Sequence, residues 1–469
     1  MRRMTQDLGT EQRPLRVGVI GSGPSAFYAA DAVFRVGGLH ARVDMFDRLP
    51  TPFGLVRGGV APDHQNIKAV VKVYQKVAEQ PGYRFFGHVQ IGRDLLVTDL
   101  EEHYHMLVWA VGCESDQRLG IPGEDLSGVH SATEFVGWYN GHPDFRERSF
   151  DLAAATRVAV VGNGNVAMDV ARILLKDPEA LATTDIADHA LNALRASKVR
   201  EVYLLGRRGP AQAAFSPKEI EEIAELPGVD VVVAPAEAEL DPYSAEWLAT
   251  QKGSAQRNVA FLQERARLGE GGGARKLRCR FLVLPVEVQA GDGRVAAVRV
   301  QCARLEPDAG GTPRPRPIDR FETLPVELVF EAIGYRGVPV PGMSFDPRKG
   351  IIPNADGRVL GEPGGPVRPG HYVVGWAKRG PTGLVGTNSP DSKATVERMV
   401  ADLQAGKALA PRQDAIEARL RQRGIDFVTW QDWQRLDAHE LAEGNARGKV
   451  RHKEPSVEAL MAAVRRLRP

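Results

Sequence analysis

Two stretches of the sequence carry the same pattern, in which an apolar run leads through a turn with two glycines into a segment with helical periodicity. They are "VGVIGSGPSAFYAADAV" at 17–33 and "VVGNGNVAMDVARILL" at 160–175. Each is followed by a second strand-like run, "ARVDMFD" at 41–47 and "REVYLLGRRGP" at 200–210. A strand, a glycine turn, a helix and a parallel strand make up the βαβ unit that binds a dinucleotide. The repeated pattern therefore predicts an α/β fold with two Rossmann-like dinucleotide-binding domains.

We call the two glycine turns the first cradle (20–26) and the second cradle (161–167). In the first cradle, Gly21 permits the tight turn and Gly23 lets the backbone approach a pyrophosphate. The helix that follows each turn offers its first N–H groups and the positive end of its dipole to the phosphates. Two cradles therefore imply two bound dinucleotides.

The residues at the ends of the second strands differ in charge. Asp47 is placed to accept hydrogen bonds from the hydroxyl groups of an unphosphorylated ribose, as in FAD or NAD. Arg207 and Arg208 stand at the corresponding end in the second unit, where a guanidinium pair binds a 2′-phosphate that an acid would repel. The alternatives are a solvated loop aspartate and a solvated pair of arginines. The two strand ends together favour FAD and NADP as cofactors.

The rest of the chain shows how the domains are organised. The run "YHMLVWAVG" at 104–112 predicts a buried strand, with a domain boundary near Gln117. The stretch 280–305 has two strand-like runs around the turn "GDG", which indicates an antiparallel meander. We expect 1–116 and 332–469 to form one domain, with 117–331 inserted between its parts. The glycine-rich segment 269–275 and the proline-rich segment 310–318 are expected to be exposed loops.

Composition excludes several classes of protein. The 61 Lys and Arg residues nearly balance the 59 Asp and Glu residues, which argues against general nucleic-acid binding. The three cysteines are too far apart to predict a disulfide framework, a zinc site or a thiol relay, and a cytoplasmic location fits best. We expect no membrane helix, and the N-terminal stretch 1–14 lacks the apolar core of a signal peptide.

Five blocks of sequence resemble the adrenodoxin-reductase type of ferredoxin–NADP reductase. They are "DRLPTPFGLVRGGVAPDH", "VVGNGNVAMDVARILL", "GRRGPAQAAFSPKE", "YVVGWAKRGPTGLVGTN" and, near the C-terminus, "FVTWQDWQRLDAHE". The resemblance implies a glutathione-reductase-like fold, in which both chain ends form an FAD domain and an NADP domain is inserted between them.

The resemblance also implies roles for individual residues. For FAD it implies Ser25, Asp47, Leu55, Ile91, Trp376, Gly383, Leu384 and Val385. For NADP it implies Asn163, Gly164, Asn165, Val166, Arg207, Arg208 and Glu219, with Gly383 near the nicotinamide. It places His64 and Glu222 beside the nicotinamide ring, where they would orient the ring rather than act as acid and base. Without the resemblance, His64 reads as a structural histidine and Glu222 as part of a solvated helix face.

The reaction that the resemblance implies is hydride transfer from NADPH to FAD, followed by single-electron transfer to two ferredoxins in turn. Such a chain commonly feeds haem monooxygenases or iron–sulfur assembly. Because ferredoxins are generally acidic, a basic face should receive them, and Arg195, Lys198 and Arg200 are candidates. A disulfide reductase of the same fold needs a dithiol, and Cys113 stands alone. The alternatives are a non-enzymatic nucleotide-sensing module and an NADPH-dependent reductase of another acceptor.

Overall fold

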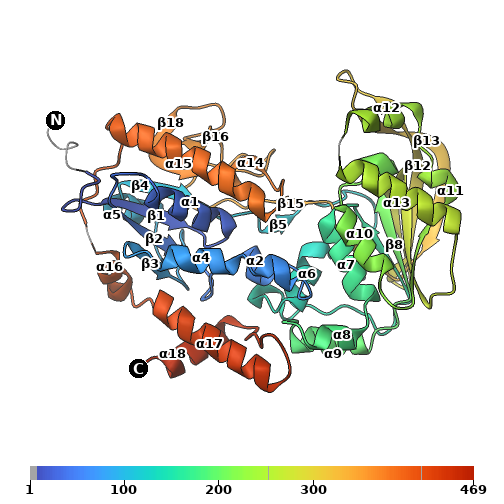
Figure 1. Cartoon of the computed structure of the whole chain (residues 1–469), viewed down its shortest axis with the longest axis horizontal. Coiled ribbons are helices and arrows are strands. Elements are labelled where there is room, and N and C mark those ends of the chain that lie inside the picture. The colour runs from blue at the N-terminus through green and yellow to red at the C-terminus, as the bar shows by residue number, and fades with distance from the viewer. Residues whose placement is uncertain (1–7, 252, 414) are drawn as a thin grey trace. The chain divides into compact units, whose positions relative to one another are not determined.

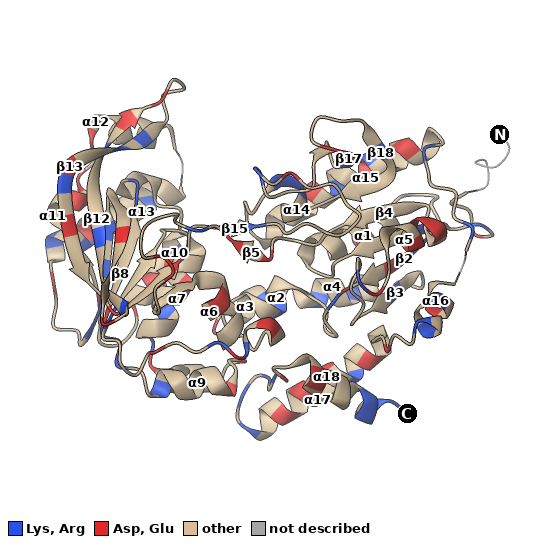
Figure 2. Ribbon diagram, turned by 180° about the vertical axis from the view of Figure 1, so that it is seen from behind, with Lys and Arg blue, Asp and Glu red and all other residues tan. Residues whose placement is uncertain are grey.

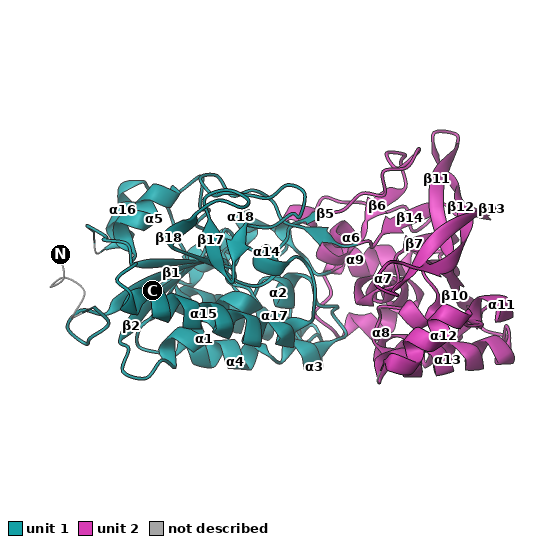
Figure 3. Ribbon diagram, turned by 90° about the horizontal axis from the view of Figure 1, so that it is seen from above, with its two compact units in different colours: residues 1–115, 140–143, 334–469 teal, residues 116–139, 144–333 magenta. Residues whose placement is uncertain are grey.

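The computed structural model describes residues 8–251, 253–413 and 415–469. The chain forms two compact units (Figure 3): unit 1 comprises Met1–Ser115, Asn140–Pro143 and Gly334–Pro469, and unit 2 comprises Asp116–Tyr139 and Asp144–Ile333. The first half of the N-terminal stretch 1–14 lies outside the described residues. Where the chain passes between the units, β5 (Ser115–Asp116) and β15 (Tyr335–Arg336) form a short two-stranded ladder.

Unit 1 is built on a seven-stranded sheet with the order β16-β17-β18-β4-β1-β2-β3. Its strands are β1 (Leu15–Ile20), β2 (Ala41–Phe46), β3 (Tyr83–Phe86), β4 (Met106–Trp109), β16 (Asn354–Ala355), β17 (Arg358–Leu360) and β18 (Val367–Val373). β1 pairs in parallel with β2 and β4, and β18 adds a further parallel strand beside β4. Both ends of the chain therefore build one sheet, with unit 2 inserted, which confirms the predicted fold class.

Helices cover both faces of this sheet. They are α1 (Pro24–Phe34), α2 (Leu55–Gly58), α3 (Gln65–Lys68), α4 (Val71–Ala78), α5 (Val97–His103), α14 (Trp376–Arg379), α15 (Asn388–Gln404), α16 (Ile416–Gln422), α17 (Trp430–Ala446) and α18 (Val457–Leu467), with the 3-10 helix η3 (Val385–Thr387). α1 and α15 lie side by side, although a long stretch of sequence separates them (Figure 1). Phe27 of α1 and Met399 of α15 are buried in one apolar cluster with Val17 and Val19 of β1. This packing brings a C-terminal helix to the first cradle.

Unit 2 contains a six-stranded, fully parallel sheet with the order β6-β14-β7-β8-β10-β9. Its strands are β6 (Val129–Ser131), β7 (Arg157–Val161), β8 (Glu201–Gly206), β9 (Val229–Val233), β10 (Arg275–Phe281) and β14 (Leu328–Glu331). Its helices are α6 (Ala132–Tyr139), α7 (Asn165–Leu175), α8 (Pro178–Ala182), α9 (Asp188–Arg195), α10 (Pro217–Ala224), α11 (Pro235–Ala238), α12 (Pro242–Thr250) and α13 (Ser254–Leu268), with the 3-10 helices η1 (Pro143–Phe145) and η2 (Pro210–Gln212). The predicted β7-turn-α7-β8 arrangement is present, with α8 and α9 added to the crossover.

The predicted meander packs on the other face of this sheet. It consists of β11 (Val283–Gly291), β12 (Arg294–Pro307) and β13 (Pro313–Pro325), all antiparallel. Asp292 and Gly293 connect β11 and β12 with positive φ angles of 51° and 76°, as a two-residue hairpin turn requires. Val298 of the meander shares an apolar cluster with Val161 and Val329 of the parallel sheet. Unit 2 therefore has three layers: helices, parallel sheet and meander.

Two details of the predicted organisation were wrong. The proline-rich segment 310–318 is not an exposed loop, because most of it belongs to the edge strand β13. Pro313, Pro315 and Pro317 occupy alternate positions there, so the missing N–H groups all face away from β12 and cost no ladder hydrogen bond. The strand-like run that begins at 280 also spans two strands, since Leu282, with φ 57°, separates β10 from β11.

Within the described part of the chain, no helix has both the length and the apolar character that a membrane crossing requires. Cys113, Cys279 and Cys302 are each buried and take part in no disulfide.

Candidate functional site

The first glycine of each cradle cannot be replaced without a clash. Gly21 and Gly162 have φ angles of 102° and 133°. A Cβ atom on either residue would lie 2.3 Å from a backbone oxygen, that of Ala110 below Gly21 and that of Ala332 below Gly162. Both the backbone conformation and the close approach of a neighbouring strand end therefore require glycine.

The second glycine of each cradle faces open space. Gly23 and Gly164 are the N-cap residues of α1 and α7, and neither helix has a side-chain cap or an acidic residue in its first turn. A Cβ atom on either glycine would meet no atom of the described residues within 4 Å. By contrast, Thr429 caps α17 by accepting a hydrogen bond from the backbone N–H of Asp432 at 3.2 Å. The uncapped helix ends and the space beside them fit two phosphate groups.

Asp47 contacts the first cradle directly. Its Oδ2 accepts hydrogen bonds from the backbone N–H of Ser22 at 3.0 Å and from the Ser22 hydroxyl, and its Oδ1 accepts one from the backbone N–H of Leu49 at 2.9 Å. Burial raises the pKa of Asp47, and the Ser22 hydrogen bond opposes that shift. Oδ1 keeps one acceptor position for a ribose hydroxyl. Sequence reasoning missed Ser22, although its place between two cradle glycines was a usable signal.

A strained loop crosses the first cradle. Phe53 has φ 83°, and its backbone N–H donates to the backbone carbonyl oxygen of Ser22 at 2.9 Å. A Cβ atom on Gly54 would lie 3.1 Å from Cα of Gly23. Leu55, a predicted FAD contact, begins α2 directly after this crossing and is 37% exposed. The structure therefore brings Leu55 to the first cradle.

The C-terminal part of unit 1 also reaches the first cradle. The Ser25 oxygen accepts a hydrogen bond from the Ser392 hydroxyl of α15 at 2.9 Å. A Cβ atom on Gly375 would lie 2.6 Å from Oγ of Ser25, so the turn before Trp376 packs against the start of α1. Trp376 begins α14, and its indole N–H donates to the Thr382 oxygen at 3.2 Å. The structure therefore brings the turn that precedes Trp376 to Ser25, and the role of both residues in binding FAD stays a prediction.

The remaining residues predicted for FAD lie in two settings. Gly383 has φ 81°, and Leu384 is exposed over 65% of its surface. Val385 begins η3 and packs against the apolar cluster that contains α1. Ile91 is 7% exposed and belongs to the cluster on the other face of the sheet, with Trp109.

The asparagines of the second cradle have different surroundings. Asn165 Oδ1 accepts a hydrogen bond from the backbone N–H of Ser216 at 2.8 Å, which fixes the start of α10 beside the cradle. The backbone carbonyl oxygen of Asn163 accepts a hydrogen bond from the backbone N–H of Ala214 at 3.0 Å. Asn163 Nδ2 is buried and has no hydrogen-bond partner among the described residues. A buried donor without a partner at a cradle fits a bound nucleotide.

The two arginines after β8 form a concentrated positive charge. Arg207 is exposed and Arg208 is half-buried, and within the described ranges no carboxylate forms an ion pair with either guanidinium. Burial lowers the pKa of Arg208, and repulsion from Arg207 and Arg314 lowers it further. Guanidinium groups held together without a countercharge fit an anionic ligand such as a 2′-phosphate.

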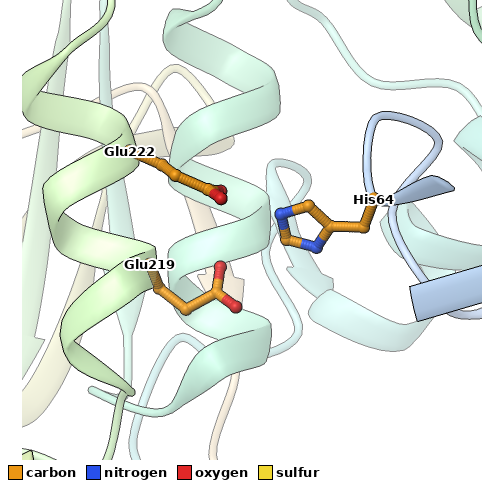
Figure 4. Close-up of side chains that lie close together, drawn as sticks. All are labelled: His64, Glu219 and Glu222. Carbon is orange, nitrogen blue, oxygen red and sulfur yellow. The ribbon is translucent and has the colours of Figure 1, made fainter. Parts of the chain in front are cut away.

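Glu219 and Glu222 project from the same side of α10 (Figure 4). Glu219 is buried and forms an ion pair at 3.0 Å with Arg172 of α7, which also pairs with Asp169 at 2.6 Å. Glu222 is partly exposed and forms an ion pair with Lys218 at 3.2 Å. Sequence reasoning missed Arg172, although a charged residue in the apolar run "VARILL" was a usable signal.

His64 occupies the N-cap position of α3 in unit 1, and it is 6% exposed. Its backbone N–H donates to the Ala61 oxygen at 3.0 Å, which closes the turn at the end of "GVAPDH". His64 and Glu222 belong to different units, and their joint role at the nicotinamide stays a prediction.

The residues suggested for ferredoxin docking are partly engaged by the protein. Arg195 forms an ion pair with Glu179 at 2.7 Å, and Arg200 donates to the Val199 oxygen at 2.9 Å. Figure 2 shows acidic and basic residues interspersed on the elements of unit 2. Their role in docking stays a prediction.

Comparison with known proteins places these features in a family. No family model matches the chain. It is 44% identical to NADPH-ferredoxin reductase FprA of Mycobacterium tuberculosis over 460 residues, which cover 96% of this chain and 99% of that protein. It is 41% identical to the mitochondrial NADPH:adrenodoxin oxidoreductases of Arabidopsis thaliana (96% of this chain, 95% of that protein) and Bos taurus (96% and 92%). The structure of M. tuberculosis FprA in complex with NADPH matches with a TM-score of 0.90 and 42% identity, covering 96% of this chain and all of that one. The chain belongs to the family of NADPH-ferredoxin reductases and NADPH:adrenodoxin oxidoreductases.

Proposed function

We propose that this protein is a flavoprotein oxidoreductase that takes hydride from NADPH onto FAD and passes single electrons to a ferredoxin. The observation that carries the proposal is the pair of uncapped cradles with opposite charges at their second strand ends, Asp47 in one and Arg207 with Arg208 in the other. The names of the relatives, which include ferredoxin and adrenodoxin reductases, support the same activity and the same partner.

The first cradle is the proposed FAD site, in the domain formed by 1–116 and 332–469. The N-terminal amides of α1 bind the pyrophosphate, and Asp47 accepts a hydrogen bond from the ribose. The other residues proposed to contact FAD are Gly21, Gly23, Ser25, Leu55, Ile91, Trp376, Gly383, Leu384 and Val385.

The second cradle is the proposed NADP site, in the domain 117–331. The start of α7 binds the pyrophosphate, with Asn163, Gly164, Asn165 and Val166 around it. Arg207 and Arg208 bind the 2′-phosphate, and this contact distinguishes NADP from NAD. Glu219 is proposed to contact the nucleotide from a position fixed by its ion pair with Arg172.

The chemistry resides in the cofactor, since bound FAD accepts two electrons as hydride and releases them singly. The protein's residues bind the two cofactors, orient them and exclude water from them. We propose that His64 and Glu222 orient the nicotinamide and set the local charge, because hydride transfer itself moves no separate proton to them. The free, buried cysteines support a cytoplasmic location.

The test is reduction of cytochrome c by the FAD-loaded protein with NADPH, with and without added ferredoxin. We expect a rate that depends on ferredoxin and that falls strongly when NADH replaces NADPH. A protein that binds both nucleotides but reduces neither ferredoxin nor ferricyanide is a nucleotide-sensing module. Rapid ferricyanide reduction without ferredoxin reduction indicates another acceptor.

A further inference from the structure

Helix α17, the second helix from the C-terminus, packs against the loop that crosses the first cradle. We call residues 51–59 the cradle loop; it contains Phe53, Gly54 and α2. Phe53 adopts φ 83°, a conformation that costs a residue other than glycine about 1–3 kcal/mol and persists only when the surroundings impose it. The cradle loop therefore needs contacts that keep it in place.

Aromatic rings supply one set of these contacts. Phe53 is 3% exposed, and its ring lies edge-on to Trp433 and Trp430, with centroids 5.7 and 6.2 Å away. Phe27 of α1 and Tyr74 of α4 complete the cage at 5.5 and 6.1 Å. Because both tryptophans belong to α17, this helix forms one wall of the cage that holds the strained residue.

A buried ion cluster supplies the second set. Arg57 of α2 donates two hydrogen bonds to Glu440 of α17, at 2.8 and 2.6 Å. The Glu440 side chain is fully buried, and it also accepts a hydrogen bond from Arg451 at 2.8 Å. The Arg57 guanidinium lies 5.4 Å from the ring centre of Trp433. The same helix therefore holds both Phe53 and Arg57, on either side of Gly54 and Leu55.

The segment after α17 completes this arrangement. Lys453 is 5% exposed, and its Nζ donates to the Arg57 oxygen at 3.2 Å and to the Asn140 oxygen at 3.0 Å. The backbone N–H of His452 donates to the backbone carbonyl oxygen of Glu440 at 3.0 Å. A Cβ atom on Gly444 would lie 2.5 Å from Cα of Arg451, so this segment is packed closely against α17.

Buried ion pairs contribute little net stability compared with well-packed apolar residues, because both charges must be desolvated. A bidentate pair does fix the relative orientation of its two partners. In this cluster the pair fixes α2, which starts at the predicted flavin contact Leu55.

We propose that Glu440 is a positioning residue of the flavin site, which acts through Arg57 to hold Gly54 and Leu55 against the first cradle. This inference rests on the proposed function, since it assigns FAD to the first cradle. It extends the site to a C-terminal helix that has no predicted contact with either cofactor.

Equilibrium binding of FAD to the apoprotein tests the proposal. We expect Glu440→Gln to raise the Kd for FAD about tenfold and to shift the visible flavin absorption bands, because a loosened support displaces the contact residues. Arg57→Lys keeps the charge but loses the bidentate geometry, so it should give the same spectral shift. Glu443→Gln is the matched control, since Glu443 is a partly exposed glutamate of the same helix that forms an ion pair with Arg447 at 3.3 Å and no contact with the cradle loop in the described residues.

An apolar replacement separates positioning from stability. In the double variant Arg57→Met/Glu440→Leu, Arg451 keeps its ion pair with Asp437 at 2.6 Å, so the apoprotein's thermal midpoint should stay near that of the wild type, yet FAD should still bind more weakly. Wild-type FAD affinity and spectrum in this variant would overturn the proposal. Wild-type protein that binds no FAD at all would instead overturn the proposed function.

Hydrogen exchange of the wild-type protein makes the test independent of whether any variant folds. We expect FAD to slow exchange in residues 430–454 as well as in the cradle loop, because the two segments share the aromatic cage and the ion cluster. Protection of the cradle loop without any protection of 430–454 would contradict the proposal.

Discussion

The first and second cradles have the same glycine geometry, but only the first forms hydrogen bonds with the charged residue at the end of its second strand. In the first cradle, Asp47 accepts two hydrogen bonds from Ser22, inside the turn itself. In the second, Arg207 and Arg208 form no ion pair with a carboxylate in the described residues. Asp47 thus stabilises the backbone turn of the first cradle, whereas the arginine pair makes no such contribution to the second cradle.

This difference separates binding from stability. A change at Asp47 would disturb both the turn and the ribose contact, because buried acceptors satisfy the Ser22 donors. A change at the arginines removes repulsion between like charges and leaves every hydrogen bond of the second cradle in place. We therefore expect nucleotide choice to be easier to alter in unit 2 than in unit 1.

The strand end beneath each cradle also differs. Ala110 and Ala332 provide the backbone oxygens that face Gly21 and Gly162. The residue before Ala110 is Trp109, whose indole N–H donates to His371 Nδ1 at 3.2 Å. The residue before Ala332 is Glu331, which is 3% exposed and has one carboxylate oxygen without a partner in the described residues. The strand end that faces the second cradle therefore contains a buried acid, whereas the one that faces the first contains a tryptophan whose N–H is hydrogen-bonded.

The largest expected effect comes from filling the tight turn. We expect Gly162→Ala to destabilise unit 2 by about 3–5 kcal/mol, because the new Cβ clashes with the backbone and φ is positive. Gly164→Ala has space in the protein, so it should leave the thermal midpoint unchanged and weaken only NADPH binding. Calorimetry and NADPH titration of both variants check this contrast. Equal stability losses would mean that the open space beside Gly164 belongs to the fold rather than to a ligand.

The next effect concerns nucleotide choice. We expect Arg207→Gln/Arg208→Gln to lower kcat/KM for NADPH by an amount that corresponds to about 2–4 kcal/mol of lost transition-state stabilisation. The reason is that NADPH, unlike NADH, has a 2′-phosphate, which loses its two guanidinium partners in this variant. The value for NADH should stay unchanged, and the thermal midpoint should not fall. Steady-state kinetics with both nucleotides measure the difference. Equal losses for NADPH and NADH would remove these residues from the 2′-phosphate site.

A smaller effect is the pH dependence that Glu331 gives to unit 2. Burial raises the pKa of Glu331 from 4.5 to about 7, Arg118 opposes that shift, and Glu124 and Asp116 add to it. Because the folded protein holds the proton more tightly than the unfolded chain, stability should fall as pH rises from about 4.5 to 7. We expect Glu331→Gln to abolish about 2 kcal/mol of this loss.

Urea unfolding at pH 5 and pH 8 measures the effect of Glu331. The control is Glu225→Gln, which changes an exposed glutamate of the same unit. If the wild type and Glu331→Gln lose the same stability between the two pH values, Glu331 does not hold a proton in the folded state.

The local patterns in the sequence predicted most of the fold. The glycine spacing at 21–26 and 162–167 predicted both cradles, and the turn "GDG" between two strand-like runs predicted the meander, because short-range sterics determine both features. The prolines of β13 were misread, since only the pairing partner decides whether a missing N–H faces a strand or solvent. Edge position is a tertiary property, and a local pattern does not contain it.

The contacts between distant segments were the part of the site that the sequence could not provide. Ser22 with Asp47 and Arg172 with Glu219 are pairs whose members lie far apart in the sequence. Each residue alone reads as an ordinary polar residue. The cage of Trp430 and Trp433 around Phe53 has the same origin, since a helix near the C-terminus packs on a loop near the N-terminus.

The smallest expected effect concerns His64 of unit 1 and Glu222 of unit 2, both of which are proposed to orient the nicotinamide. His64 is buried at a helix N-cap, whereas Glu222 is partly exposed and paired with Lys218. Because neither transfers the hydride, we expect His64→Gln and Glu222→Ala each to slow reduction of the protein by NADPH roughly tenfold, or about 1.4 kcal/mol in barrier. FAD retention should not change in either variant.

Lys218→Met is the control, since it removes the partner of Glu222 while keeping the carboxylate, and it should react at close to the wild-type rate. Stopped-flow measurement at saturating NADPH separates this loss from weaker binding. Wild-type rates in both variants would assign His64 to the turn before α3 and Glu222 to the solvated face of α10.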